Sequence, residues 1–191
     1  NGDWWIDDVF INRTHYAAAS VSTPGNTDMR SVQFIPGTDK AIMVGDDGVV
    51  WKFSAGSVSA LSNSDSNDLR ALAFKPLNNT ALLVGDAGTV LRYYGSNDTI
   101  QGMSFPDSSI SLWDVAFKPG FSRDGPKPDS SQALLVGASG AAWQYFGYDD
   151  HFEKASTGES KTLYAVAFNV SCHPVYGPAL IVGHGSDPVV L

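Results

Sequence analysis

The feature of this chain that most restricts its fold is an internal repeat. Four segments align with one another: "DMRSVQFIPGTDKAIMVGDDGVVWKF" from Asp28, "DLRALAFKPLNNTALLVGDAGTVLRYYG" from Asp68, "SLWDVAFKPG" from Ser111 with "QALLVGASGAAWQYFG" from Gln132, and "TLYAVAFNV" from Thr162 with "PALIVGHGSDPVVL" from Pro178. The units recur about every 40 to 50 residues, a period typical of repeat architectures. We therefore expect four similar structural units.

Each unit is predicted to contain four short antiparallel strands. The first strand, for example residues 69–74, alternates apolar and smaller residues and ends before a proline in three units. The second strand is an apolar run such as "ALLVG", without alternation because both of its faces are buried. A turn ending in a glycine suited to positive φ leads into the third strand; these glycines are Gly48, Gly88 and Gly140. Polar stretches at 57–62, 99–104 and 151–156 fit a fourth, outer strand.

The fold class follows from these units. No helical period continues for three turns, so the chain is predicted to be all-β. Antiparallel sheets of four strands in units of this length are typical of β-propeller blades. We expect a single domain of about four blades, at 28–67, 68–110, 111–160 and 161–191, the last completed by residues 1–27. The alternatives are that the chain is part of a larger propeller, or that it forms a β-helix.

The inner strands also predict how the units pack. Leu72 and Phe74 alternate with Ala71 and Ala73, so one face of the strand is bulky and the other thin. Sheets that stack as wedges around an axis need such an asymmetry.

The composition and the absence of certain motifs exclude several classes of partner and of functional site. With 12 Lys and Arg against 20 Asp and Glu, the net charge of −8 repels a phosphate backbone, so no nucleic-acid partner is expected. No apolar stretch is long enough to span a membrane. The single cysteine, Cys172, excludes an internal disulfide. No nucleotide-binding or nucleophile motif is present, so no cofactor and no catalytic residue is predicted.

Four N-x-S/T sequons favour a secreted or lumenal glycoprotein. They begin at Asn12, Asn78, Asn97 and Asn169. All four fall in expected loops or strand ends. The alternative is that a chain rich in Ser and Asn contains them by accident.

The hairpin sequence "VGDxGxV" followed by an aromatic resembles the repeats of WD/YVTN-like and Asp-box propellers, including photosystem II assembly factors. The first unit is the most similar to the Asp-box pattern, with Asp46, Gly48 and Trp51 in register. Other units depart from it: Leu91 replaces the tryptophan in the second and Ala138 the aspartate in the third. The resemblance implies a blade type and leaves the function open.

One position in the first strand of each unit is a candidate ligand contact, expected at one mouth of the central channel. Its occupants are Arg30, Arg70, Trp113 and Tyr164. The arginines would bind a carboxylate and the aromatics would stack on a sugar or planar group. The alternative is that these residues form ion pairs and packing contacts, with Asp28 and Asp68 as partners.

Two further groups of residues stand out in the sequence. Asp46, Asp86 and His184 share the hairpin-tip position, but tips of separate blades lie too far apart to hold one metal ion, and no metal site is predicted. The apolar residues Trp4 and Trp5 near the N-terminus are expected to be buried in the closing blade; otherwise they would dock onto a neighbouring subunit.

We therefore expect a non-enzymatic propeller that binds a protein or glycan partner through its top face and loops. A first alternative is a sialidase-like hydrolase, or part of one. Such enzymes need a third arginine and a nucleophilic Tyr/Glu pair, where this chain has Trp113 and Tyr164. A second alternative is a structural subunit that assembles through its terminal strands.

Overall fold

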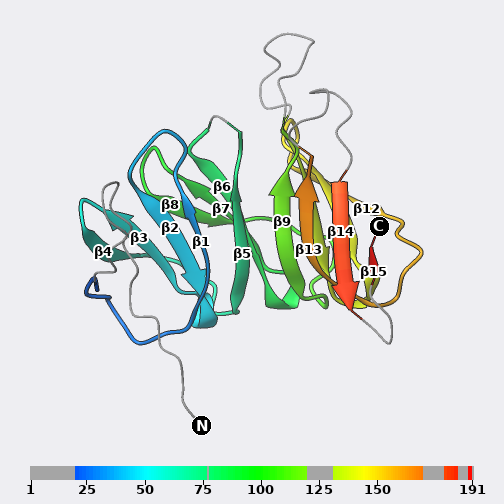
Figure 1. Cartoon of the computed structure of the whole chain (residues 1–191), viewed down its shortest axis with the longest axis horizontal. Coiled ribbons are helices and arrows are strands. Elements are labelled where there is room, and N and C mark those ends of the chain that lie inside the picture. Colours follow the sequence, from blue (N-terminus) through cyan, green and yellow to red (C-terminus); the bar gives the residue numbers. More distant parts are fainter. Residues whose placement is uncertain (1–19, 77, 120–130, 170–178, 185–188, 191) are drawn as a thin grey trace.

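The computed structural model describes residues 20–76, 78–119, 131–169, 179–184 and 189–190. Within these ranges the chain consists of antiparallel β-sheets joined by short turns (Figure 1). Three sheets have four strands and one has three. The all-β prediction is confirmed.

Each repeat unit forms its own sheet, in which every strand pairs with the next along the chain. Sheet 1 contains β1 (Met29–Phe34), β2 (Ala41–Gly45), β3 (Val50–Ser54) and β4 (Ser57–Leu61). Sheet 2 contains β5 (Leu69–Phe74), β6 (Thr80–Gly85), β7 (Val90–Tyr94) and β8 (Thr99–Gly102). Sheet 3 contains β9 (Leu112–Phe117), β10 (Gln132–Gly137), β11 (Ala142–Phe146) and β12 (His151–Ala155). Sheet 4 contains β13 (Thr162–Phe168), β14 (Ala179–His184) and β15 (Val189–Val190).

In the first three sheets, the second and third strands are joined by a tight turn. The turns are η1 (Asp46–Gly48), η2 (Asp86–Gly88) and η3 (Ala138–Gly140). Their final glycines have φ of +68, +66 and +71°, as the sequence predicted. The residue before each glycine is also left-handed, with φ of 55° at Asp47, 51° at Ala87 and 54° at Ser139. The turn therefore places two consecutive residues in this region, which the sequence alone did not indicate.

The sheets stack face to face through the alternation seen in their first strands. We call the face of a sheet that points to the preceding sheet its first face, and the opposite one its second face. Leu72 and Phe74, on the first face of sheet 2, pack in one cluster with Ile42 and Val44 of sheet 1. The small residues of β5, such as Ala73, are on the second face and pack against sheet 3. Bulky first faces thus cover the second faces of their predecessors.

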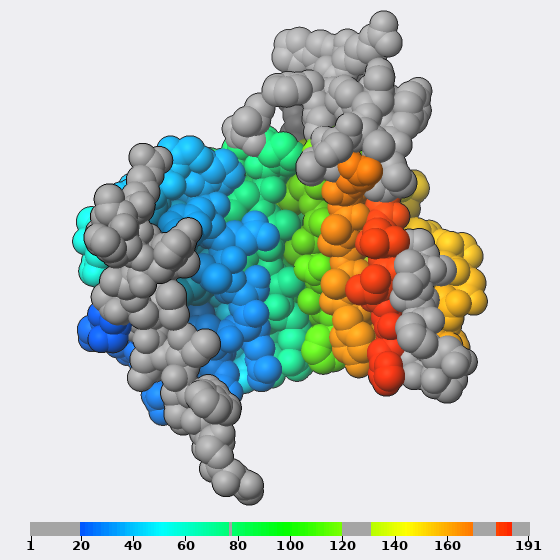
Figure 2. All heavy atoms as spheres, viewed as in Figure 1, coloured from blue at the N-terminus to red at the C-terminus, as the bar shows by residue number. Residues whose placement is uncertain are grey.

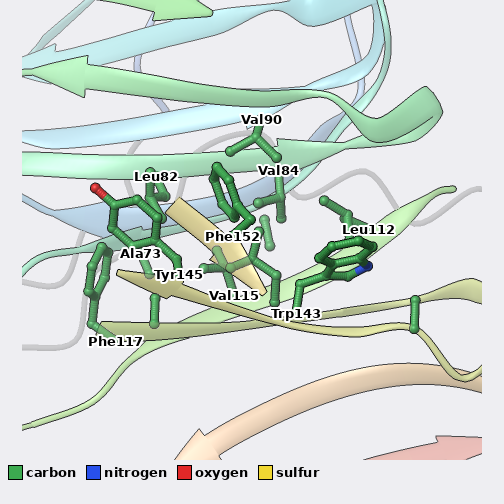
Figure 3. Packing of buried hydrophobic residues seen from close by; sticks show 14 residues of the cluster. Ala73, Leu82, Val84, Val90, Leu112, Val115, Phe117, Trp143, Tyr145 and Phe152 are labelled. Carbon is green, nitrogen blue, oxygen red and sulfur yellow. The ribbon is translucent and has the colours of Figure 1, made fainter. Parts of the chain in front are cut away.

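The cluster between sheets 2 and 3 is the largest (Figure 3). Trp143, Tyr145 and Phe152 of sheet 3 lie among the aliphatic residues of sheet 2. Phe105 lies in the connection between the two sheets. Its ring centroid is 5.0 Å from that of Trp143 and 5.3 Å from that of Phe152. Burial of these aromatics is a main source of stabilisation, since each removes a large apolar area from water.

The four sheets form an open array within the described part of the chain. The inner strands contact one another in the order β1, β5, β9, β13, and Figure 1 shows sheets 1 and 4 at opposite ends. Residues 21–24 of the N-terminal segment line a groove with residues 56–60 at β4 of sheet 1. Residues 1–19 of the segment expected to complete the last unit, which include Trp4 and Trp5, lie outside the described residues.

Candidate binding site at the strand bulges

The four residues predicted to contact a ligand are the unpaired residues of four equivalent β-bulges. In sheet 1, Met29 pairs with Gly45 and Ser31 pairs with Val44, so Arg30 between them has no partner across the ladder. The same register shift leaves out Arg70, Trp113 and Tyr164. A bulge redirects the side chain of its extra residue. We call these four residues the bulge row.

A glycine at or next to the end of each second strand makes room for the bulge. A Cβ atom built on Gly85 would lie 2.1 Å from the carbonyl oxygen of Asp68, which immediately precedes β5. The equivalent distances are 2.2 Å at Gly45, 2.3 Å at Gly137 and 2.4 Å at Gly183. The backbone of Gly85 is extended, with φ of −164°, so close approach of the two chains explains the glycine. The repeated "VG" is thus the sequence mark of the bulge.

Both arginines of the bulge row are held by a carboxylate of their own sheet. Arg30 donates from Nε and Nη2 to the two carboxylate oxygens of Asp46, each at 2.7 Å. Arg70 makes the same bidentate pair with Asp86, at 3.1 and 2.5 Å. Hydrogen bonds from these guanidinium groups lower the pKa of both aspartates. The carboxylates at the hairpin tips are therefore occupied as arginine partners.

Three members of the bulge row touch one another across three sheets. The guanidinium carbon of Arg70 lies 4.7 Å from the centroid of the Trp113 ring, within the range of a cation–π contact. The Trp113 ring meets the Tyr164 ring edge to face, with centroids 5.4 Å apart. Arg30 is bound to Asp46 instead. The geometry thus joins Arg70, Trp113 and Tyr164 into one continuous surface.

The described turns beside the bulge row differ in charge. Around sheets 1 and 2 the turns carry Asp46, Asp47 and Asp86, and the Asp47 backbone N–H donates to the Asp68 carboxylate at 3.0 Å. At the equivalent turn of sheet 3 the residues are Ala138 and Ser139. The bulge row therefore runs from the ion-paired arginines of sheets 1 and 2 to the aromatic residues of sheets 3 and 4.

The described sequons lie at the opposite end of the strands. Asn78 follows β5, Asn97 precedes β8 and Asn169 follows β13, whereas the bulges lie at the start of the first strands. All three asparagines are exposed. Asn12 and the two residues after Asn169 lie outside the described ranges.

Sequence reasoning missed a polar network between the outer parts of the sheets. Lys52 of β3 donates to Asp98 of the β7–β8 turn at 2.6 Å, and Tyr93 donates to the same carboxylate at 2.7 Å. Sheets 2 and 3 repeat this arrangement, with Arg92 and Tyr145 both donating to Asp150. Hydrogen bonds from Arg92 and Tyr145 lower the pKa of Asp150, although its partial desolvation acts to raise it. These partners recur at equivalent positions in successive repeats, and that signal could have identified them.

The described residues hold no group of three or more His, Cys, Asp or Glu placed to bind a metal ion. His151 pairs with Glu153 at 3.4 Å, and Cys172 is not among the described residues. In the same ranges, no helix is long and apolar enough to cross a membrane.

The fold and the bulge row define the chain as an all-β repeat protein of stacked antiparallel sheets. No family model and no curated protein matches it. Among solved structures it resembles the computationally designed Ika4 protein, with a TM-score of 0.62 over 90% of this chain and 94% of that one. The sequences are 16% identical, so the likeness concerns the fold alone.

Proposed function

We propose that this protein is a non-enzymatic binding module of the β-propeller type. Its ligand would be a protein or glycan partner, bound at the bulge row and the adjacent hairpin turns. The observation that carries the proposal is the continuous contact from Arg70 through Trp113 to Tyr164. Tyr164 is 45% exposed and offers its ring to a ligand.

The chemistry of the row favours a stacking ligand. Arg30 and Arg70 are already neutralised by Asp46 and Asp86, so an anionic group would have to compete with two bidentate pairs. An aromatic ring can still stack on a sugar or on a planar side chain. The net charge of −8 would attract a partner that carries positive charge.

The position of the sequons agrees with a secreted or lumenal module. Glycans on Asn78, Asn97 and Asn169 would project from the end opposite to the bulge row and leave it accessible. Expression in a secretory host should give a mass increase that a glycan-removing amidase reverses. Substitution Asn97→Gln should remove one glycan, and an unmodified secreted chain would contradict this part of the proposal.

The binding proposal is tested by screening the purified chain against a glycan array and a displayed peptide library. For each ligand found, Tyr164→Ala should weaken binding at least about tenfold, because aromatic anchors supply much of an interface's energy. The matched control is Tyr148→Ala, which removes another exposed tyrosine beyond the bulge row, in the β11–β12 turn. No ligand in either screen, ligands insensitive to Tyr164→Ala, or hydrolysis of a glycoside by the wild type would contradict the proposal.

A further inference from the structure

The first face of sheet 1 is uncovered at positions that are buried in sheets 2 and 3. Val32 and Phe34 of β1 are 60% and 64% exposed. Their equivalents in sheet 2, Leu72 and Phe74, are 1% and 9% exposed because sheet 1 covers them. Among the described residues, sheet 1 therefore presents a stacking face without a neighbouring sheet.

The second face of sheet 4 is uncovered in the same way at the other end of the array. Leu180 and Val182 of β14 are 54% and 39% exposed. Their equivalents in β6, Leu82 and Val84, are fully buried against sheet 3. Figure 2 shows the two ends, with sheet 1 in blue and β14 in red.

The two uncovered faces are of the two types that contact each other inside the chain. All three contacts between sheets in the described part of the chain join a second face to the first face of the next sheet. Within the described ranges, sheet 4 leaves a second face free and sheet 1 leaves a first face free. Each end therefore matches the other end of a second copy, and neither end matches itself.

We propose that two copies of this chain assemble head to tail, with sheet 4 of each stacking on sheet 1 of the other. A contact between different faces makes a closed ring when its rotations add to a full turn. Two copies supply eight sheets, within the range of about 4 to 8 blades typical of propellers. The new contacts continue the series of three that the chain already contains. The proposal does not depend on the bulge row or its ligand.

The first test is the molar mass of the full chain in solution, measured by light scattering after size exclusion without attached glycans. The expected mass is twice the 20.3 kDa of the chain at micromolar concentration. A monomer, an open series of higher oligomers or a larger ring would overturn the proposal. A monomer would leave further sheets of a longer polypeptide as the occupant of the free faces.

Two single variants then separate head-to-tail assembly from other dimers. Phe34→Asp disables the free first face and Leu180→Asp disables the free second face. Each variant alone should be monomeric, whereas Tyr148→Asp, at an exposed tyrosine outside both faces, should remain dimeric. A dimer made through two first faces would instead survive Leu180→Asp, and that result would overturn the proposal.

Mixing the two variants provides the decisive comparison. One intact first face and one intact second face remain, on different chains, so equimolar Phe34→Asp and Leu180→Asp should recover a dimer that neither forms alone. Recovery also shows that both variants fold. Two variants that give the circular dichroism of the wild type but stay monomeric in the mixture would contradict head-to-tail stacking.

Discussion

The guanidinium carbon of Arg70 lies 4.7 Å from the centroid of the Trp113 ring, although the two residues belong to different sheets. Both are bulge residues, so the contact requires the bulges of β5 and β9 to lie in register. The contact therefore depends on three features: the repeat, the close approach of the chains at Gly85 and Gly137, and the stacking of the sheets.

The contribution of this contact can be isolated by comparing two arginines. Arg30→Lys and Arg70→Lys each remove a bidentate pair with an aspartate, but only the second removes a planar group from above a tryptophan. We expect Arg70→Lys to lower the free energy of unfolding by about 1 kcal/mol more than Arg30→Lys, as measured by urea denaturation. Equal losses would show that the ring contact adds no stability.

Gly85 should not tolerate a side chain. A methyl group there would overlap the Asp68 carbonyl oxygen, so we expect Gly85→Ala to cost about 1–3 kcal/mol of unfolding free energy. Gly102 of β8 is the matched control, because a Cβ there meets no atom within 4 Å. Thermal or chemical denaturation should show Gly102→Ala within about 0.5 kcal/mol of wild type. Similar effects of the two substitutions would argue against the close approach.

Arg92 and Asp150 should be energetically coupled across sheets 2 and 3. Their carboxylate–guanidinium pair is supported by Tyr145, but Asp150 is about half exposed and is partly screened by water. A double-mutant cycle with Arg92→Met and Asp150→Asn should give a coupling energy of about 1 kcal/mol. Asparagine suits the positive φ of 57° at position 150. The exposed pair His151–Glu153 is the control, with an expected coupling near zero.

Acid should destabilise the protein through its paired aspartates. Hydrogen bonds from arginine lower the pKa of Asp46, Asp86 and Asp150 in the folded state. Between these pKa values and that of the unfolded chain, the unfolded state binds more protons, so the unfolding free energy falls as the pH drops below about 4.

Asp114 has the opposite effect on the pH dependence of the unfolding free energy. Burial raises its pKa, so the folded state binds the extra proton and this residue's contribution to the unfolding free energy weakens as the pH rises above about 4.

The substitution Asp86→Asn isolates the contribution of one ion pair to the pH dependence of stability. Denaturation curves from pH 7 to pH 2.5 should show a smaller acid loss in Asp86→Asn than in wild type. An unchanged loss would mean that the pair with Arg70 contributes nothing to the pH dependence.

The strands could be predicted from sequence because their signals are local. The alternation around Leu72 and Ala73 marks the two faces of β5, and the structure places these residues on opposite sides of the sheet. The outer strands, which are poorly repeated, also fell where the polar stretches indicated, as β4, β8 and β12 show.

The bulges and the arrangement of the sheets could not be predicted in the same way. The register shift at Arg70 cannot be recognised from the residues of β5. The residue that indicates it is Gly85 on the paired strand. The angle between neighbouring sheets depends on side-chain packing, so counting repeats could not show that the described array stays open. The exposure of Phe34 shows the open end, and it is a property of the tertiary structure.

The register of the bulge row can be measured directly by nuclear Overhauser contacts from the Trp113 ring, with Trp113→Phe used for assignment. We predict contacts to the Arg70 side chain of the preceding sheet and to the Tyr164 ring of the following sheet. A well-resolved Trp113 ring that contacts only one of these residues, or neither, would contradict the stacked arrangement on which the proposed site is built.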